Sequence, residues 1–386
     1  MPVAVNQRET YLYSDQEAGE VQNSGEGGEK EKMHPALFHW KRLEQVVSEV
    51  LVQAGARREH ARLVAESLVH ADLRGIESHG LERLPIYLQR IVAGLIELNE
   101  EPVVWKQEGA TALVDGKNQL GAVVGVVALE EAIKLSRQMG IGIVGVRHSN
   151  HFGSCSYYAE RAIAEGMILL VLSNAPEAMA PTGGIRPFFG TNPIAVGIPA
   201  GEEPSFLLDM ATSVAARGKI ALAVKKGESI PADWAIDRNG KETTDPKQAL
   251  LGSLLPIGGA KGYGLAMFID ILCGLLTGAA TGPHVKSLYD NWNDPQNVGH
   301  LFLTVNIERF MPLPDFCANM DAYIREVKSV PMKEGVSEIF IPGEIESRKK
   351  QQRIENGIPF NPNLTEELSQ LCRTYGVDLQ AAYHIP

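Results

Sequence analysis

GIGIVGVRHSNHFG, residues 140–153, is the stretch that decides the fold of this chain. Its first six letters match G-x-G-x-x-G, a motif that holds a dinucleotide only as the turn between a strand and the following helix. Here Gly140 instead follows a helical pattern at Val126–Gln138, and IGIVGV itself has the composition of a strand. The stretch therefore predicts a buried strand, and no Rossmann turn.

Short apolar runs on both sides of this strand alternate with helical patterns. Runs at Ala112–Val114 and Met167–Leu172 have the length of buried strands, and Ser156–Ala164 has helical spacing. This alternation predicts an α/β domain over residues 108–285. Further elements expected in it are strands at Pro193–Pro199 and Phe206–Asp209 and a long buried helix at Tyr263–Leu276.

Residues 34–107 are expected to form a mostly helical subdomain. From Arg58 to Leu73, apolar residues recur three and four positions apart, which is typical of an amphipathic helix, and Gly75 ends it. A second helix is expected to start after Ser78 and to stop at Gly94.

The C-terminal part, residues 286–386, mixes strand and helix patterns. A strand is expected at His300–Val305, a helix near Pro314–Ser329, and a charged segment at Glu344–Asn356. We expect this part to pack back on the helical subdomain.

Residues 1–33 are expected to be a disordered leader. Residues 1–32 hold seven acidic and three basic side chains and little apolar surface to bury. They also lack the apolar stretch of a signal peptide. The sequence leaves open whether Met1 or Met33 begins the working protein.

Composition is that of an ordinary globular protein, with 386 residues, 44% hydrophobic and 22% charged. The net charge of −11 argues against broad binding to nucleic acid or to an anionic membrane. The most apolar long segment, Gly264–Gly282, contains Asp270, which favours a buried helix over a membrane span. The four cysteines are widely separated and predict neither a zinc site nor a disulfide framework. Cytoplasm is the expected location.

Ser78-His79-Gly80 lies at the expected start of a helix, and Arg83 follows His79 by four residues. On a helix this spacing places an imidazole and a guanidinium on one face. Histidine exchanges protons near neutral pH, and arginine grips carboxylates with two parallel hydrogen bonds. The alternative is that Ser78 is a helix cap and His79 a structural histidine.

His148 and His151 follow the strand at 141–146, where α/β domains commonly present ligand-binding side chains. Metal ligation is the rival interpretation. No carboxylate or cysteine lies close enough in sequence to complete a usual zinc site, so no metal is expected.

Two further turns carry polar groups. Asp209-Met210-Ala211-Thr212-Ser213 follows a strand and offers a carboxylate and two hydroxyls, with a helix cap as the alternative. Gly258–Gly264 is a glycine-rich turn with one lysine, Lys261, and it lacks the spacing of a Walker A loop. Such a turn can hold a phosphate or carboxylate through backbone N–H groups, or it can simply begin a helix.

Taken together, these segments resemble the type 2 malate/L-lactate dehydrogenase family, which includes ureidoglycolate dehydrogenase, sulfolactate dehydrogenase and 2,3-diketogulonate reductase. The similarity runs from about Arg58 to Arg348. It is carried, in this order, by RGIESHGLERLPIY, GIGIVGVRHSNHFG, FFGTNPIAVGIP, DMATS, IPADWAIDRNGKETTDP, GGAKGYG and IFIPGE.

The resemblance implies a homodimer with a non-Rossmann nicotinamide-binding α/β domain. It implies hydride transfer between NAD or NADP and a small 2-hydroxy or 2-oxo acid. By similarity, His79 is a proton donor or acceptor with Ser78 beside it, and Arg83 binds the substrate carboxylate. His151 matches the histidine assigned as acid/base in ureidoglycolate dehydrogenases, so the choice between the two histidines stays open. The cofactor residues implied are Ser173, Asn174, Ala175, Asp209, Met210, Ala211, Lys261, Gly262, Gly343, Glu344 and Ile345.

Three alternatives stay beside this interpretation. Ureidoglycolate oxidation is favoured by His151 and by the stretches RGIESHG and SLYDNWNDPQNVGH. A non-catalytic binding protein of the same fold is the second. A hydrolase built from Ser78, His151 and Asp209 is the third, although no G-x-S-x-G elbow is present. The sequence selects neither the substrate and its stereochemistry nor NAD against NADP.

Overall fold

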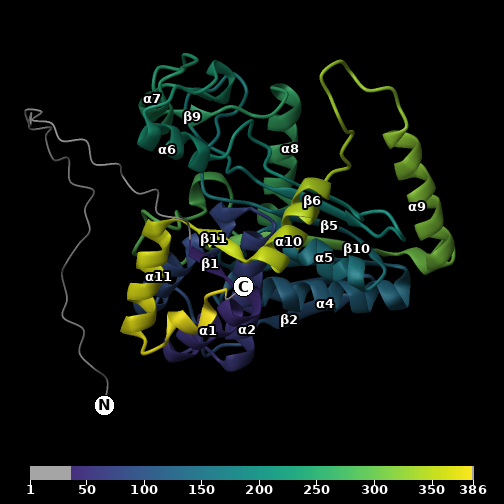
Figure 1. Ribbon diagram of the computed structural model, residues 1–386, viewed down its shortest axis with the longest axis horizontal. Helices are drawn as coiled ribbons and strands as arrows, with labels where there is room; N and C mark the ends of the chain where they lie inside the picture. Colours follow the sequence, from purple (N-terminus) through teal and green to yellow (C-terminus); the bar gives the residue numbers. More distant parts are fainter. Residues whose placement is uncertain (1–35, 385–386) are drawn as a thin grey trace, which may run out of the picture. The chain divides into compact units, whose positions relative to one another are not determined.

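The computed structural model describes residues 36–384 (Figure 1). The expected leader at residues 1–33 lies outside the described residues.

A seven-stranded mixed sheet forms the centre of the fold. Its order is β2 (Val103–Glu108), β3 (Thr111–Asp115), β4 (Ile141–Ser149), β10 (Val298–Asn306), β5 (Met167–Ser173), β6 (Ile194–Ile198) and β7 (Phe206–Met210). The pairings make β3, β4, β5 and β7 run in one direction and β2, β10 and β6 in the other. All the strands expected from the sequence are present, and the α/β class is confirmed.

The predicted strand after Gly140 is confirmed as β4, which follows helix α4 (Gly121–Met139). Gly140 ends that helix in the left-handed conformation, with φ of 89°. A Cβ on Gly142 would lie 2.1 Å from the carbonyl oxygen of Ala132 in α4, so this glycine lets helix and strand pack closely. These glycines therefore serve a helix end and a helix–strand contact, and no Rossmann turn forms here.

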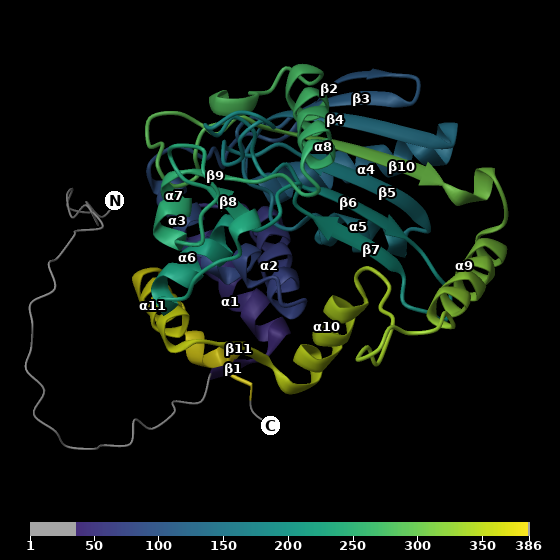
Figure 2. The ribbon, with the colours of Figure 1, turned by 90° about the horizontal axis from the view of Figure 1, so that it is seen from above.

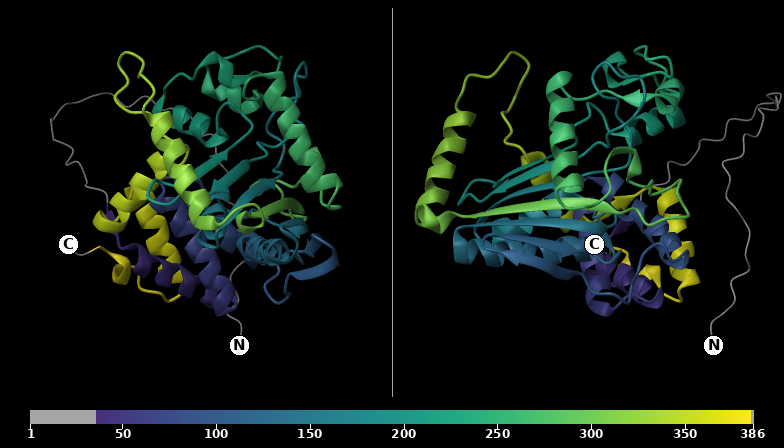
Figure 3. Two further views of the ribbon diagram at one scale, coloured as in Figure 1. Left: turned by 90° about the vertical axis from the view of Figure 1, so that its right-hand side faces the viewer. Right: turned by 180° about the vertical axis from the view of Figure 1, so that it is seen from behind.

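Helices cover both faces of the sheet (Figures 2 and 3). Side chains alternate between the faces along β10. Phe302 packs with α4 and with α5 (Cys155–Ala164), whereas Leu301 packs with Ile269 and Cys273 on the other side. The latter two belong to α8 (Ala260–Asp270) and to the π-helical turn η4 (Ile271–Leu275) that continues it.

The expected buried helix at 263–276 is present, but its burial was predicted wrongly. Phe268 is 51% exposed and Leu275 is 68% exposed. The sheet covers only one side of this helix, so apolar residues on its other side face outward.

A group of helices lies beside the sheet. It contains α1 (Trp40–Gln53), α2 (Arg58–Leu73) and α3 (Leu84–Val92). Elements from the C-terminal part join it: α10 (Glu344–Asn356), α11 (Pro362–Thr374) and β11 (Ile358–Phe360), which pairs with β1 (Ala36–Phe38). Leu43, Leu68, Phe360 and Leu368 share its core.

We expected all of residues 286–386 to pack on the helical subdomain. This expectation is wrong for β10, which lies between β4 and β5 in the central sheet. Helix α9 (Leu313–Lys328) also lies apart from these helices, beyond the other end of the sheet (Figure 2). Antiparallel pairing on both sides of β10 explains the difference, because a strand far along the chain can enter a sheet between two earlier strands.

A small lobe follows β7. It contains α6 (Arg217–Lys226), α7 (Pro246–Leu251) and a short pair, β8 (Ala235–Ile236) with β9 (Ser253–Leu254). Met179, Ile220 and Leu254 lie in its core. Within residues 36–384, no helix combines the length and the apolar character that a membrane crossing requires.

Candidate active site

The polar turns singled out from the sequence leave the sheet at one edge. Ile194 in β6 pairs with Leu172 of β5 and with Met210 of β7, so the turns after β5 and β7 begin side by side. Val298 pairs with Ser149 at the end of β4, which brings the turn after β4 to the same edge. Ligands of open α/β sheets bind at the carboxyl ends of parallel strands, and this edge holds those ends.

His79 and His151 meet at this edge. Their rings are stacked with centroids 5.5 Å apart. His79 ends a 3₁₀ turn, η1 (Glu77–His79), and His151 follows β4 by two residues. Ser78 Oγ lies 3.0 Å from Nδ1 of His79, and the Tyr87 hydroxyl lies 2.5 Å from Nδ1 of His151. Each imidazole is therefore anchored through Nδ1, and Nε2 of neither ring has a hydrogen-bond partner among the described residues.

Arg83 reaches the same place, but not on a shared helix face as expected. A second 3₁₀ turn, η2 (Leu81–Arg83), follows η1, and α3 begins only at Leu84. Between the two turns, the buried Asp72 carboxylate accepts the backbone N–H of Leu81 at 2.9 Å. A Cβ on Gly80 would lie 1.9 Å from that carboxylate, so the turn requires glycine.

The folded-back turns bring Arg83 against Ser78, and Nε of Arg83 donates to the Ser78 carbonyl oxygen at 2.6 Å. Ser78 does not act as the helix cap that was its alternative role, because its hydroxyl faces His79. Arg83 could also have been a surface residue paired with a nearby acid such as Glu82 or Glu77, but no such ion pair is found among the described residues, and Glu77 binds Arg353 at 2.7 Å. Within residues 36–384, no carboxylate lies at ion-pair distance from Arg83.

The electrostatics of this cluster suit an anionic substrate. Burial, and then the Arg83 charge, lower the pKa of His79 to about 4. Burial lowers the pKa of His151 as well, with further contributions from Arg83 and His79. Both imidazoles are consequently neutral at pH 7 and able to accept a proton, beside a guanidinium that attracts a carboxylate.

The sequence did not single out Tyr87 as a site residue. Tyr87 ends the stretch RGIESHGLERLPIY, about one helical turn after Arg83. A tyrosine among apolar residues predicts a core position, not a site residue. Burial raises the pKa of Tyr87, so the side chain stays a neutral hydroxyl, whose oxygen can accept Nδ1–H of His151. Gln296 was also missed, and its Oε1 accepts the backbone N–H of His151 at 3.0 Å.

His300, the last residue of the stretch SLYDNWNDPQNVGH, was not singled out as a site residue, yet it connects two of the turns. Its ring nitrogens lie 2.9 Å from Oγ of Ser149 and 2.9 Å from Oγ of Ser173, and its ring stacks on Phe152 at 4.0 Å. Burial lowers its pKa to about 3. A neutral, buried His300 therefore fixes the ends of β4 and β5 relative to each other.

His148 points away from this cluster. It adopts φ of 51°, and its Nδ1 lies 3.1 Å from Asp115. The two histidines of the HSNH stretch thus do not converge. In the part of the chain that the structure describes, no group of histidine, cysteine and carboxylate side chains is arranged as a metal site.

The residues expected to bind the cofactor fall into three places. Ser173 and Asn174 are buried at the end of β5, where the Asn174 side chain donates to Ala280 and accepts from Gly299. The Ala175 N–H donates to Asn192 at 3.0 Å. These hydrogen bonds hold the turn together. A ligand could therefore contact mainly those atoms of the turn that are exposed.

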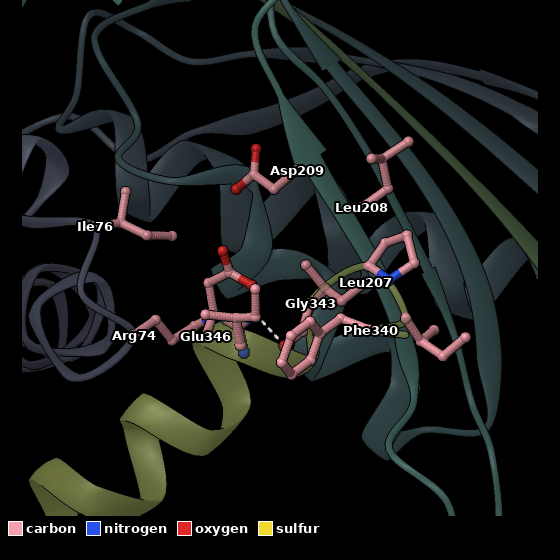
Figure 4. A pocket seen from close by; sticks show the side chains of 11 residues that line it. Arg74, Ile76, Leu207, Leu208, Asp209, Phe340, Gly343 and Glu346 are labelled. Carbon is pink, nitrogen blue, oxygen red and sulfur yellow. Dashed lines mark hydrogen bonds between the residues drawn. The ribbon is translucent and has the colours of Figure 1, made fainter. Parts of the chain in front are cut away.

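The second place is a cavity of about 330 Å³ beside this edge (Figure 4). Asp209, Gly343 and Ile345 line it, whereas Met210, Ala211 and Glu344 do not. A Cβ on Gly343 would lie 2.6 Å from the Leu207 carbonyl oxygen, so glycine lets this loop pack on β7. The buried Glu344 carboxylate is bound by Lys328 and Arg348 at 2.7 Å each, which leaves only its backbone for a cofactor.

The third place is the start of α8. Lys261 is exposed there, and a Cβ on Gly262 would lie 2.1 Å from the Ile257 carbonyl oxygen. Neither residue lines the cavity of Figure 4. The structure therefore brings Asp209, Gly343 and Ile345 together but not Lys261.

The cavity fits part of a dinucleotide. Its volume lies at the low end of small-molecule sites, and its walls combine apolar side chains with a few charged groups. One wall is formed by Arg74, whose buried Nε has no hydrogen-bond partner among the described residues.

Comparison with known proteins matches residues 38–369 to a family model described as malate/L-lactate dehydrogenase. A malate dehydrogenase of Pyrococcus abyssi is 42% identical over 340 residues, which cover 86% of this chain and 92% of that protein. A ureidoglycolate dehydrogenase (NAD⁺) of Escherichia coli K12 is 36% identical, covering 84% and 93%.

Among solved structures, sulfolactate dehydrogenase from Methanocaldococcus jannaschii superposes with a TM-score of 0.84. It is 40% identical, and the alignment covers 90% of this chain and 99% of that one.

Proposed function

The chain belongs to the malate/L-lactate dehydrogenase family, and from this we infer that His79, His151 and Arg83 form the active site of an NAD(P)-dependent dehydrogenase. The enzyme transfers a hydride between a nicotinamide cofactor and a small 2-hydroxy or 2-oxo acid. The observation that carries the assignment of residues is the convergence of two neutral imidazoles and an arginine without a carboxylate partner among residues 36–384.

The nicotinamide ring, when bound, supplies or accepts the hydride. In the oxidation direction, Nε2 of His79 or His151 takes the proton of the substrate hydroxyl. In the tautomer that this step requires, Nδ1–H of each ring donates to the hydroxyl oxygen of Ser78 or Tyr87, which holds the ring in place and leaves the lone pair on Nε2. A ring held in this way loses less conformational entropy when it adopts the geometry for proton transfer.

Arg83 binds the substrate carboxylate in this proposal. The guanidinium is partly buried, and its Nε is already fixed to the Ser78 carbonyl. Its remaining N–H groups can take both oxygens of a carboxylate. The substrate carbon next to that carboxylate then lies beside the two imidazoles, which is the arrangement that a 2-hydroxy acid requires.

Ureidoglycolate is a second candidate substrate. His151, which matches the acid/base histidine of ureidoglycolate dehydrogenases, lies next to His79. An assay of malate, lactate, sulfolactate and ureidoglycolate, each with NAD⁺ and with NADP⁺, tests the proposal. We expect reduction of a cofactor with at least one of these acids. A folded protein that reduces neither cofactor with any of them would contradict the proposal and favour the non-catalytic binding protein.

For the cofactor, we propose contacts with the turns after β5 and β7, with Lys261 and Gly262, and with Gly343, Glu344 and Ile345. Sheet geometry supports the first two turns, which share one edge. The cavity supports Asp209, Gly343 and Ile345. On this view residues 108–285 together with β10 form the cofactor-binding domain.

Lys261→Ala is expected to weaken cofactor binding without unfolding the protein. One charge-assisted hydrogen bond to a phosphate contributes about 1.5–3 kcal/mol, or roughly 10- to 150-fold in affinity. Fluorescence titration with NADH and NADPH measures it, with Lys226→Ala, an exposed lysine of α6, as the control. Unchanged affinity for both cofactors would remove Lys261 from the site.

We also propose a homodimer. The outer side of α8, of η4 and of the residue that follows η4 carries apolar residues that are each at least 40% exposed: Met267, Phe268, Ile271, Leu275 and Leu276. Exposed apolar residues gathered on one element are typical of a protein–protein interface. A cytoplasmic location is proposed as well, because all four cysteines are free, as is usual in a reducing compartment.

A further inference from the structure

The cavity of Figure 4 is unusual in the balance of its charges. Two carboxyl side chains line it, Asp209 from β7 and Glu346 from α10. Arg74 is the one cation among its lining residues. That guanidinium binds Glu160 at 2.6 Å, and the same Glu160 carboxylate also receives His70 at 3.1 Å and pairs with Lys350. Glu160 therefore offsets part of the Arg74 charge and fixes the guanidinium in place.

The two carboxylates differ in their bonding. Asp209 accepts the backbone N–H of Ser156, at the start of α5, at 2.8 Å. The Glu346 carboxylate, in contrast, makes no hydrogen bond or ion pair with any residue in the range 36–384, whereas the nearby Glu344 carboxylate binds two cations. In Figure 4 the Glu346 carboxyl group extends into the cavity on the side toward Asp209. Both oxygens of the Glu346 carboxylate can therefore accept hydrogen bonds from a ligand in the cavity.

The other walls suit a flat ring. Ile76, Leu207, Phe340 and Ile345 surround the cavity with apolar surface, including one aromatic ring. Aromatic and aliphatic walls favour a planar base, and a carboxylate favours a hydroxyl donor. An adenosine combines these features, with a planar adenine and a ribose that offers two hydroxyl groups.

A phosphate group at this position would be unfavourable. A phosphate monoester carries close to two negative charges at neutral pH. In the cavity it would face the carboxylate of Glu346, and the one arginine of the lining is already bound to Glu160. Like charges a few ångströms apart repel strongly where water is partly excluded.

We propose that this cavity takes the adenosine end of the cofactor and that Glu346 is the residue that selects NAD over NADP. Its carboxylate accepts hydrogen bonds from the ribose hydroxyls and repels the 2′-phosphate that distinguishes NADP. The inference rests on the proposed function, since it assumes that the cavity belongs to the cofactor site.

The test compares Glu346→Gln with wild type in two measurements. Calorimetry gives the Kd of ADP-ribose and of its 2′-phosphorylated form, and steady-state kinetics gives kcat/KM with NAD⁺ and NADP⁺. We expect wild type to prefer the unphosphorylated ligand, and the glutamine variant to lose about tenfold or more of that preference, because it keeps the shape and loses the charge. Glu346→Lys should reverse the preference.

Glu355→Gln is the matched control, since Glu355 is exposed on the same helix and binds Gln351. It should keep the wild-type ratio. If wild type turns over a substrate and Glu346→Gln keeps the wild-type ratio in both measurements, the inference is wrong while the proposed function stands. A wild type that prefers NADP⁺ overturns the inference in the same way. Absence of turnover with either cofactor would overturn both.

Discussion

Replacing His79 and His151 separately by asparagine is expected to lower kcat unequally, with a loss of about 10²- to 10⁴-fold for the residue that exchanges the substrate proton. Asparagine can keep a hydrogen bond to Ser78 or Tyr87, but it cannot accept a proton at the reacting position. Replacing the other histidine, which packs against the first, should lower kcat less. Single-turnover rates in both directions measure the effect, and His284→Asn, an exposed histidine in the turn after α8, is the control. If both variants keep near wild-type rates, proton exchange belongs to another group.

The pH profile of the wild type tests the same assignment. The pKa of His79 is lowered to about 4, and that of His151 is also lowered, so either imidazole is unprotonated throughout the neutral range. Oxidation needs the neutral form, so its kcat/KM should be level from about pH 6 to 8 and should fall only as the pH approaches the lowered pKa. Reduction needs the protonated form, so its kcat/KM should fall by about tenfold per pH unit over the same range. An oxidation rate that already drops steeply below about pH 7 would contradict a lowered pKa.

Arg83→Lys is expected to lower kcat/KM for 2-oxo acids by about 2 kcal/mol, or about thirtyfold, while cofactor binding stays intact. Lysine keeps the positive charge, but it cannot bind both carboxylate oxygens at once. It also cannot reproduce the bond from Nε to the Ser78 carbonyl while reaching the substrate. The loss should therefore appear in orientation as well as in affinity.

Kinetics with a 2-oxo acid and with its amide show whether Arg83 binds the carboxylate. Wild type should strongly prefer the acid, and Arg83→Lys should lose most of this preference. A variant that discriminates as wild type does would leave the carboxylate to another cation. Arg186 would then be the next candidate, because Arg147 is held by Asp115 at 3.3 Å.

The sequence predicted most of the sheet because buried strands are short apolar runs. The stretch at 140–153 was decisive, since its glycines follow a helix and its apolar letters form β4. The position of β10 could not be predicted, because apolar periodicity reveals a strand but not its neighbours. The exposure of one side of the long apolar helix could not be predicted for a related reason, because periodicity does not show which side of a helix the rest of the protein covers.

The sequence predicted which residues form the candidate site, but it did not predict how they are arranged. His79 and Arg83 were expected on one helix face, whereas Asp72 holds two 3₁₀ turns at Gly80 and brings the residues together differently. Tyr87 and His300 escaped notice because their partners are distant in sequence. For the same reason, Glu344 and Glu346 look equivalent in the sequence, although one holds its loop together and the other faces a cavity.

Direct transfer of a label tests the central claim most simply. The enzyme is incubated with a 2-oxo acid and with NADH that carries deuterium at both positions of nicotinamide C4, and the product is analysed by mass spectrometry and NMR. If the chain transfers a hydride between the cofactor and the acid, the hydroxy acid contains one deuterium at C2 and none from this source elsewhere. A hydroxy acid formed without deuterium at C2, or consumption of neither the acid nor NADH or NADPH, would contradict the account.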